Sequence, residues 1–96
     1  MTTYYTVDDI RSANSVRGYH FFDKDAMRFF DSRLSEEVYG GKYFITSERF
    51  DSRSPRLYTI RMVNDDASID TIGEFQQYET LAKAKSAVKY LLAQDA

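Results

Sequence analysis

Residues 42–61 read KYFITSERFDSRSPRLYTIR, and this stretch decides the fold class. Residues 43–50 and 57–63 are rich in aromatic and β-branched residues, and the second run alternates as a half-buried strand does. The segment between them is too long for a two-residue turn. The stretch therefore predicts a β-hairpin with a protruding loop.

The residues before the hairpin predict two helices. Thr6 has the position of an N-cap, and the helix that follows should end at Gly18. Asp23 is placed as a second N-cap. A longer helix is expected after it, stopped by the glycines at 40 and 41 and marked along one face by four apolar residues: Met27, Phe30, Leu34 and Val38.

The residues after the hairpin predict one more strand and a final helix. Residues 68–75 are expected to form a third strand after a polar turn. Thr80 caps a helix whose apolar stripe should cover the sheet. The sequence thus predicts a single α+β domain over residues 1–96, with a three-stranded antiparallel sheet packed by helices in the order α-α-β-β-β-α.

Composition narrows the class of function. The 96 residues include seven Phe and eight Tyr, enough for one core, and the net charge of −2 argues against a strongly basic nucleic-acid binder. Cysteine is absent, which excludes disulfides, thiolate catalysis and sulfur-ligated zinc. Without a signal-like N-terminus or a long apolar run, we expect a cytosolic protein that does not enter a membrane.

Catalytic and metal-binding patterns are not found in the sequence. His20 is the only histidine, and it is expected to pack at a junction between helices rather than to act as a base. Adjacent acidic residues fall at predicted helix starts and turns, where the helix dipole and solvation explain them. We therefore expect no catalytic residues, no metal, no cofactor and no small-molecule substrate, so the protein is not expected to be an enzyme.

The loop of the hairpin carries three arginines, Arg49, Arg53 and Arg56. Guanidinium groups beside aromatic rings are common in binding hot spots, and the rings in question are those of Tyr43, Phe50 and Tyr58. One interpretation is a partner-binding surface. The other is a solvated turn in which Asp51 and Glu48 neutralise two of the three charges.

The last predicted helix carries a second positive group, Lys83, Lys85 and Lys89. A solvated helix face explains these residues. The layout of helix, three antiparallel strands and basic helix also resembles the double-stranded-RNA-binding domain, which implies a small RNA- or DNA-binding domain as the alternative function. Asp65 and Asp66 stand where that family presents a groove-binding loop, which is a departure from its pattern.

Several segments together resemble small accessory proteins of bacteriophages and other mobile elements. The segments are YTV at 5–7, MRFFDSR at 27–33, YGGKYFITSE at 39–48, PRLYTIR at 55–61 and IGEF at 72–75. The resemblance implies a non-enzymatic inhibitor of host defence, such as an anti-CRISPR protein. Its partner would be a host protein or ribonucleoprotein complex in the bacterial cytosol, such as a CRISPR effector with its guide RNA. It would act there by blocking a nucleic-acid or nuclease-binding surface.

Overall fold

Three helices and four strands make up the described part of the chain, which is residues 2–29, 31–35 and 37–95 of a computed structural model. The strands form one antiparallel sheet in the order β1-β2-β3-β4. The α+β class is confirmed, but the sheet has four strands and not three. The elements are α1 Val7–Val16, α2 Lys24–Phe29, β1 Arg33–Leu34, β2 Tyr43–Glu48, β3 Leu57–Val63, β4 Ile69–Ile72 and α3 Leu81–Asp95.

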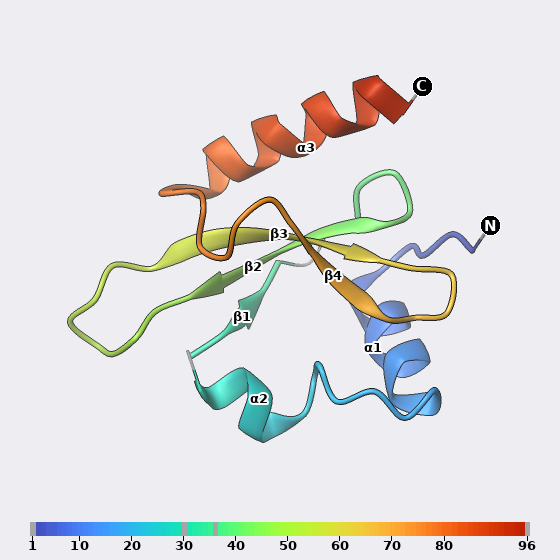
Figure 1. Cartoon of the computed structure of the whole chain (residues 1–96), viewed down its shortest axis with the longest axis horizontal. Coiled ribbons are helices and arrows are strands. Elements are labelled where there is room, and N and C mark those ends of the chain that lie inside the picture. The colour runs from blue at the N-terminus through green and yellow to red at the C-terminus, as the bar shows by residue number, and fades with distance from the viewer. Residues whose placement is uncertain (1, 30, 36, 96) are drawn as a thin grey trace.

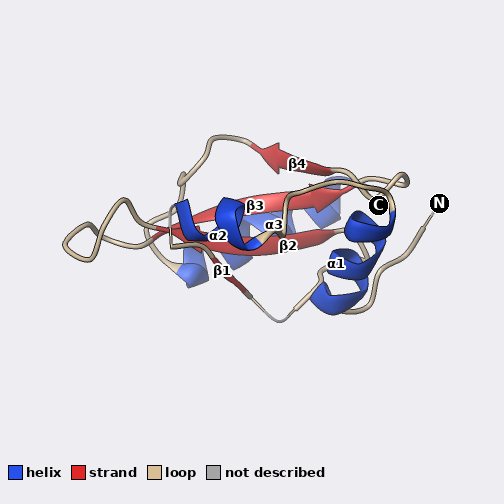
Figure 2. Cartoon of the chain, turned by 90° about the horizontal axis from the view of Figure 1, so that it is seen from below, coloured by secondary structure: helices blue, strands red, loops and turns tan. Residues whose placement is uncertain are grey.

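The helices lie on opposite faces of the sheet. Helix α3 covers one face, and α1 and α2 lie against the other (Figures 1 and 2). Because side chains alternate along a strand, β2 sends Tyr43 and Ile45 toward α3 and Phe44 toward α1. Both faces of β2 are therefore buried, and the molecule has an apolar cluster on each side of the sheet.

Helix α1 begins as the sequence predicts. The hydroxyl Oγ1 of Thr6 accepts a hydrogen bond from the Asp9 amide at 3.1 Å, and the Asp9 carboxylate accepts one from the Thr6 amide at 3.3 Å. This reciprocal capping box satisfies two backbone donors that a helix start otherwise leaves without partners. The predicted N-cap at Thr6 is confirmed, and the helix ends two residues before Gly18.

Helix α2 is much shorter than the sequence predicts. After it, the amide of Ser32 donates to the carbonyl of Met27 at 2.7 Å, and the amide of Asp31 donates to Arg28 at 3.1 Å. Asp31 has a φ of 45°, so these bonds form the Schellman type of helix end with an aspartate in the left-handed position. The expected helical face through Leu34 and Val38 is wrong, because Leu34 belongs to β1. Phe30 lies outside the described residues.

The two glycines do not stop a helix. Gly40 and Gly41 form a tight turn in which the amides and carbonyls of Tyr39 and Tyr43 bond to each other at 2.8 and 3.0 Å. Both glycines have positive φ, and a Cβ at Gly40 would overlap a methyl group of Leu92 in α3. The turn therefore requires glycine for its backbone conformation, and Gly40 also lies close to the Leu92 side chain of α3.

The remaining elements agree with the sequence in type. Strand β3 has the predicted bounds, β2 ends two residues early at Glu48, and β4 is shorter than residues 68–75. Thr80 Oγ1 accepts a hydrogen bond from the Lys83 amide at 3.1 Å, which places Thr80 at the start of α3 as expected. Across the described ranges, none of the helices has the length and apolar character that crossing a membrane requires.

Candidate functional site

The loop between β2 and β3 is the most prominent projection of the molecule. It extends from one end of the longest axis, beyond the helices that cover the sheet, in both views of the chain (Figures 1 and 2). The overall extents are 40 × 31 × 19 Å, so this loop forms one tip of an elongated protein. We call residues 49–56 the hairpin loop.

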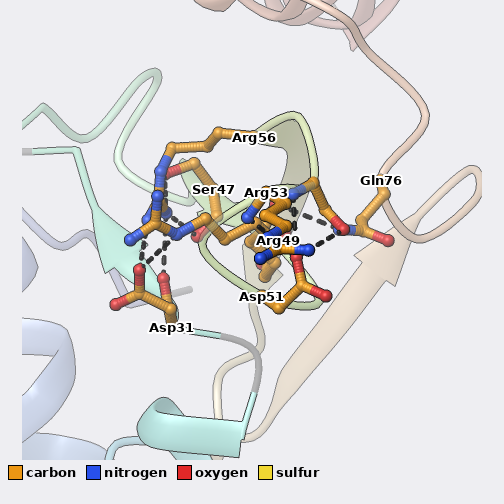
Figure 3. A network of polar contacts seen from close by, with 9 residues as sticks. Asp31, Ser47, Arg49, Asp51, Arg53, Arg56 and Gln76 are labelled. Carbon is orange, nitrogen blue, oxygen red and sulfur yellow. Dashed lines mark hydrogen bonds and ion pairs between the residues drawn. The ribbon is translucent and has the colours of Figure 1, made fainter.

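The base of the hairpin loop is tied to the chain segment after α2. The carboxylate Oδ2 of Asp31 accepts from Nε of Arg49 at 2.6 Å and from a terminal nitrogen of Arg56 at 2.8 Å. The other terminal nitrogen of Arg56 lies 2.9 Å from the Asp31 carbonyl and 3.0 Å from both the carbonyl and the hydroxyl of Ser47 (Figure 3). We call Asp31, Arg49 and Arg56 the Asp31 clamp.

The Asp31 clamp joins residues that are far apart in the sequence and holds them by charge. The hydrogen bond from Arg49 is the main cause that lowers the pKa of the Asp31 carboxyl, and the nearby charges of Arg49 and Arg56 act in the same direction. Asp31 is therefore ionised at neutral pH. Charge-assisted hydrogen bonds of this kind fix both strands of the hairpin where they leave the sheet.

The tip of the hairpin loop is held by a second aspartate. One carboxylate oxygen of Asp51 accepts from the amide of Arg53 at 2.8 Å, the amide of Ser54 at 2.9 Å and the hydroxyl of Ser54 at 3.1 Å. These bonds lower the pKa of Asp51, with the backbone bond from Arg53 as the largest cause. Such a side-chain-to-backbone turn gives the loop a defined shape without regular secondary structure.

The structure divides the predicted binding residues of the hairpin into two groups. Arg49 and Arg56 belong to the Asp31 clamp, with only 17% of the Arg56 side chain exposed, so the three arginines do not form one open cationic surface. Tyr43 is 5% exposed and packs under α3, which makes its predicted contact with a partner wrong. Tyr58 is half-buried in the same cluster. Phe50 and Arg53 remain at the surface, and Phe50 is 69% exposed.

The predicted lysines lie elsewhere on the molecule. Lys83 and Lys89 are exposed on α3, Lys85 is half-buried, and Lys83 pairs with Glu79 at 3.3 Å. Helix α3 covers one face of the sheet, while the hairpin loop extends from the end of strands β2 and β3 (Figure 1). The lysines therefore belong to a different element from the hairpin arginines.

A polar group that sequence reasoning missed lies on the sheet face that α1 and α2 cover. It consists of one carboxylate, one guanidinium and three hydroxyls, which we call the polar row: Thr46, Glu48, Thr59, Arg61 and Thr71. Glu48 is 1% exposed, and its carboxylate accepts from Arg61 at 3.0 Å, from Thr59 at 2.9 Å and from Thr46. Arg61 also donates to the hydroxyls of Thr46 and Thr71.

Strand register assembles the polar row. Thr46 pairs with Thr59 and Arg61 pairs with Thr71 across neighbouring strands, and Glu48 lies diagonal to Thr59 on the same face. Glu48 therefore neutralises Arg61 in the interior. The interpretation in which Glu48 neutralises an arginine of the hairpin loop is wrong. The signal was present in the alternation of both strands, since residues 46 and 48 share a face with Phe44.

The Arg61 guanidinium also lies beside two aromatic rings. Its central carbon is 5.2 Å from the ring centroid of Phe21 and 5.5 Å from that of Phe75, within the range of cation–π attraction. Gln76 also contacts the polar row. Its backbone N–H donates a hydrogen bond to the Thr59 hydroxyl at 2.8 Å, and its side-chain Nε2 donates to the backbone carbonyl of Glu48 at 3.0 Å. The ion pair is thus enclosed by residues from several segments.

His20 does not pack between helices as the sequence analysis expects. Its side chain is exposed, and Nδ1 lies 2.8 Å from a carboxylate oxygen of Asp23. No nucleophile is bonded to this pair among the residues that the structure describes. Within the same residues, no group of three or more acidic or histidine side chains could hold a metal ion.

Comparison with known proteins places the chain in a family. No curated protein and no solved structure matches it. The match to a family covers residues 6–89, which include every element from α1 to β4, most of α3, the hairpin loop and the polar row. The chain therefore belongs to the family of unknown function DUF7447.

Proposed function

We propose that this protein is a non-enzymatic binding protein that inserts its hairpin loop into a partner protein. The observation that carries the proposal is Phe50, a large ring that is 69% exposed on a loop held at its base by the Asp31 clamp and at its tip by Asp51. A loop already ordered in the free protein loses less conformational entropy on binding than a flexible one. Aromatic residues and arginines dominate binding hot spots.

The chemistry of the loop defines the partner surface. The Asp31 clamp, Asp51 and Arg53 together contain three guanidinium groups and two carboxylates, so one positive charge is in excess. Arg53, which is exposed, is the arginine outside the clamp. The fitting surface is an apolar pocket for Phe50 with carboxylates at its rim for Arg53.

For the identity of the partner, we propose a host defence complex in the bacterial cytosol, with a CRISPR effector as the specific candidate. The resemblance to small phage and mobile-element proteins supports this proposal. A standard interface takes about 800 Å² from each partner. That area is about an eighth of the 6199 Å² surface of this chain, so an interface of standard size engages only part of the molecule.

Affinity capture from a bacterial lysate with two matched double variants tests the proposal. The loop variant, Phe50→Ala with Arg53→Ala, truncates two exposed side chains of the hairpin loop. The α3 variant, Lys83→Ala with Lys89→Ala, truncates two exposed side chains of α3. Truncating a hot-spot residue costs about 2 kcal/mol or more of binding free energy. The affinity of the loop variant for the captured protein should therefore fall about 30-fold or more, while the α3 variant keeps the affinity of the wild type.

The same experiment separates the alternative of a small RNA- or DNA-binding domain. If the lysines of α3 carry the function, the α3 variant loses its captured material, nuclease treatment releases it, and binding falls steeply with salt. Equal capture by both variants and the wild type contradicts both surfaces. Loss with the loop variant alone, insensitive to nuclease, supports the proposed function.

A further inference from the structure

A cavity of about 230 Å³ lies over the polar row and is independent of the hairpin loop tip. Its apolar walls include Phe21, Met27 and Phe75, and its polar lining consists of Ser32, Thr46, Glu48 and Arg61. An apolar hollow with a few converging polar groups is the usual form of a small-molecule site. The proposed function uses the hairpin loop and gives no role to this cavity.

The polar lining is fixed in place before any ligand arrives. Glu48 is 1% exposed and accepts three side-chain hydrogen bonds, and the Arg61 side chain is 12% exposed. Arg61 has five N–H groups, of which three donate to Thr46, Glu48 and Thr71. The other two have no acceptor among the described residues, so the guanidinium retains donor capacity for a ligand.

Charge determines which ligand the cavity accepts. Glu48 and Arg61 neutralise each other at 3.0 Å. A charged ligand would therefore meet a like charge in a region of low dielectric, at a cost that its attraction to the other group does not recover. An uncharged ligand with a hydrogen-bond acceptor avoids this cost and can use the remaining donors of Arg61.

Volume determines the size of the ligand. An apolar cavity of about 150 Å³ holds benzene, and drug-sized ligands need about 300 Å³ or more. The present cavity lies between these values. We propose that it binds an uncharged small molecule consisting of one aromatic ring and one short substituent that accepts a hydrogen bond from Arg61.

Titration of the folded protein with three probes, followed by ¹H–¹⁵N NMR, tests the proposal. Benzamide has the expected shape and acceptor, and benzoate and benzylamine are negative and positive analogues of similar size. Benzamide should shift the Nε–H resonance of Arg61 and the amides of Thr46 and Thr71 in a saturable way. Each charged probe should bind at least tenfold more weakly.

Two alanine-to-leucine substitutions, one inside the cavity and one outside it, supply the control. Ala26 lines the cavity at an exposed position of α2, so Ala26→Leu fills the space without altering the polar row. Ala82→Leu makes the same change at an exposed position of α3 outside the cavity lining. Benzamide affinity should fall at least tenfold in the first variant and stay unchanged in the second. Absence of a saturable shift, equal loss in both variants, or equal binding of a charged probe overturns the proposal.

Discussion

Replacing Glu48 by Gln tests whether the buried ion pair organises the sheet face under α2. The substitution keeps the shape and most of the hydrogen-bonding capacity of the side chain, because the amide oxygen can still accept from Arg61 and Thr46. It removes the negative charge. Arg61, whose side chain is 12% exposed, then remains in the interior with three hydroxyl and amide partners but no counter-charge.

The expected loss follows from that geometry. Breaking a buried ion pair by removing one partner costs about 3–5 kcal/mol. The Arg61 guanidinium keeps its bonds to Thr46 and Thr71 and its position beside the rings of Phe21 and Phe75, which places the loss near the lower limit. We therefore expect a decrease of about 3 kcal/mol in the free energy of unfolding, or a shift of roughly 12–24 °C in Tm for a domain of this size.

Equilibrium unfolding in urea measures this loss, and Glu79→Gln is the matched control. Glu79 forms an exposed ion pair with Lys83 at 3.3 Å, so its loss should change stability by less than about 0.5 kcal/mol. With an unchanged denaturant slope, the midpoint of Glu48→Gln should fall by about 1–3 M urea. A change as small as that of Glu79→Gln would refute the reasoning about the polar row.

Two further predictions concern the turn glycines and the loop aspartate. Gly40→Ala should destabilise the protein by about 0.5–1.5 kcal/mol more than Gly18→Ala in the same urea assay, because both residues have positive φ but only a Cβ at position 40 would force a terminal methyl group of Leu92 in α3 to move; equal losses would show that the Leu92 side chain moves aside at no cost. The amides of Arg53 and Ser54 should titrate with a midpoint below the ordinary aspartate pKa of about 3.9, since hydrogen bonds lower the pKa of Asp51. The stabilisation from Asp51 is then fully present above that ordinary pKa and disappears as the pH falls through the lower folded-state pKa, and an NMR midpoint at or above about 3.9 would contradict the loop geometry.

Elements with strong local signals could be predicted from the sequence. The capping residue Thr6, the alternation in β3 and the apolar stripe of α3 each specify an element without reference to distant residues. Helix α2 and strand β1 could not be predicted in this way. Apolar residues continue at helical spacing past residue 29, but an aspartate takes the left-handed position that usually signals glycine. A two-residue strand such as β1 forms only because β2 lies beside it.

The candidate site shows the same limit more clearly. The sequence identifies the hairpin loop and its exposed Phe50 and Arg53. It does not indicate that Asp31, 18 residues before Arg49 and 25 before Arg56, accepts hydrogen bonds from both arginines. Whether an arginine is a binding group or a structural one depends on such long-range contacts. The sequence alone therefore left both interpretations of the loop open.

Site-specific photo-crosslinking tests most directly whether the hairpin loop is the binding element. A photoreactive residue at Ser52, which is exposed in the loop, is compared with the same residue at Ser86, which is exposed on α3. If the hairpin loop enters the partner, a photoreactive residue at position 52 crosslinks to one partner protein in a bacterial lysate, Phe50→Ala abolishes this crosslink, and the residue at position 86 yields none. A crosslink from position 86 but not from position 52, or one from position 52 that survives Phe50→Ala, would contradict this binding mode.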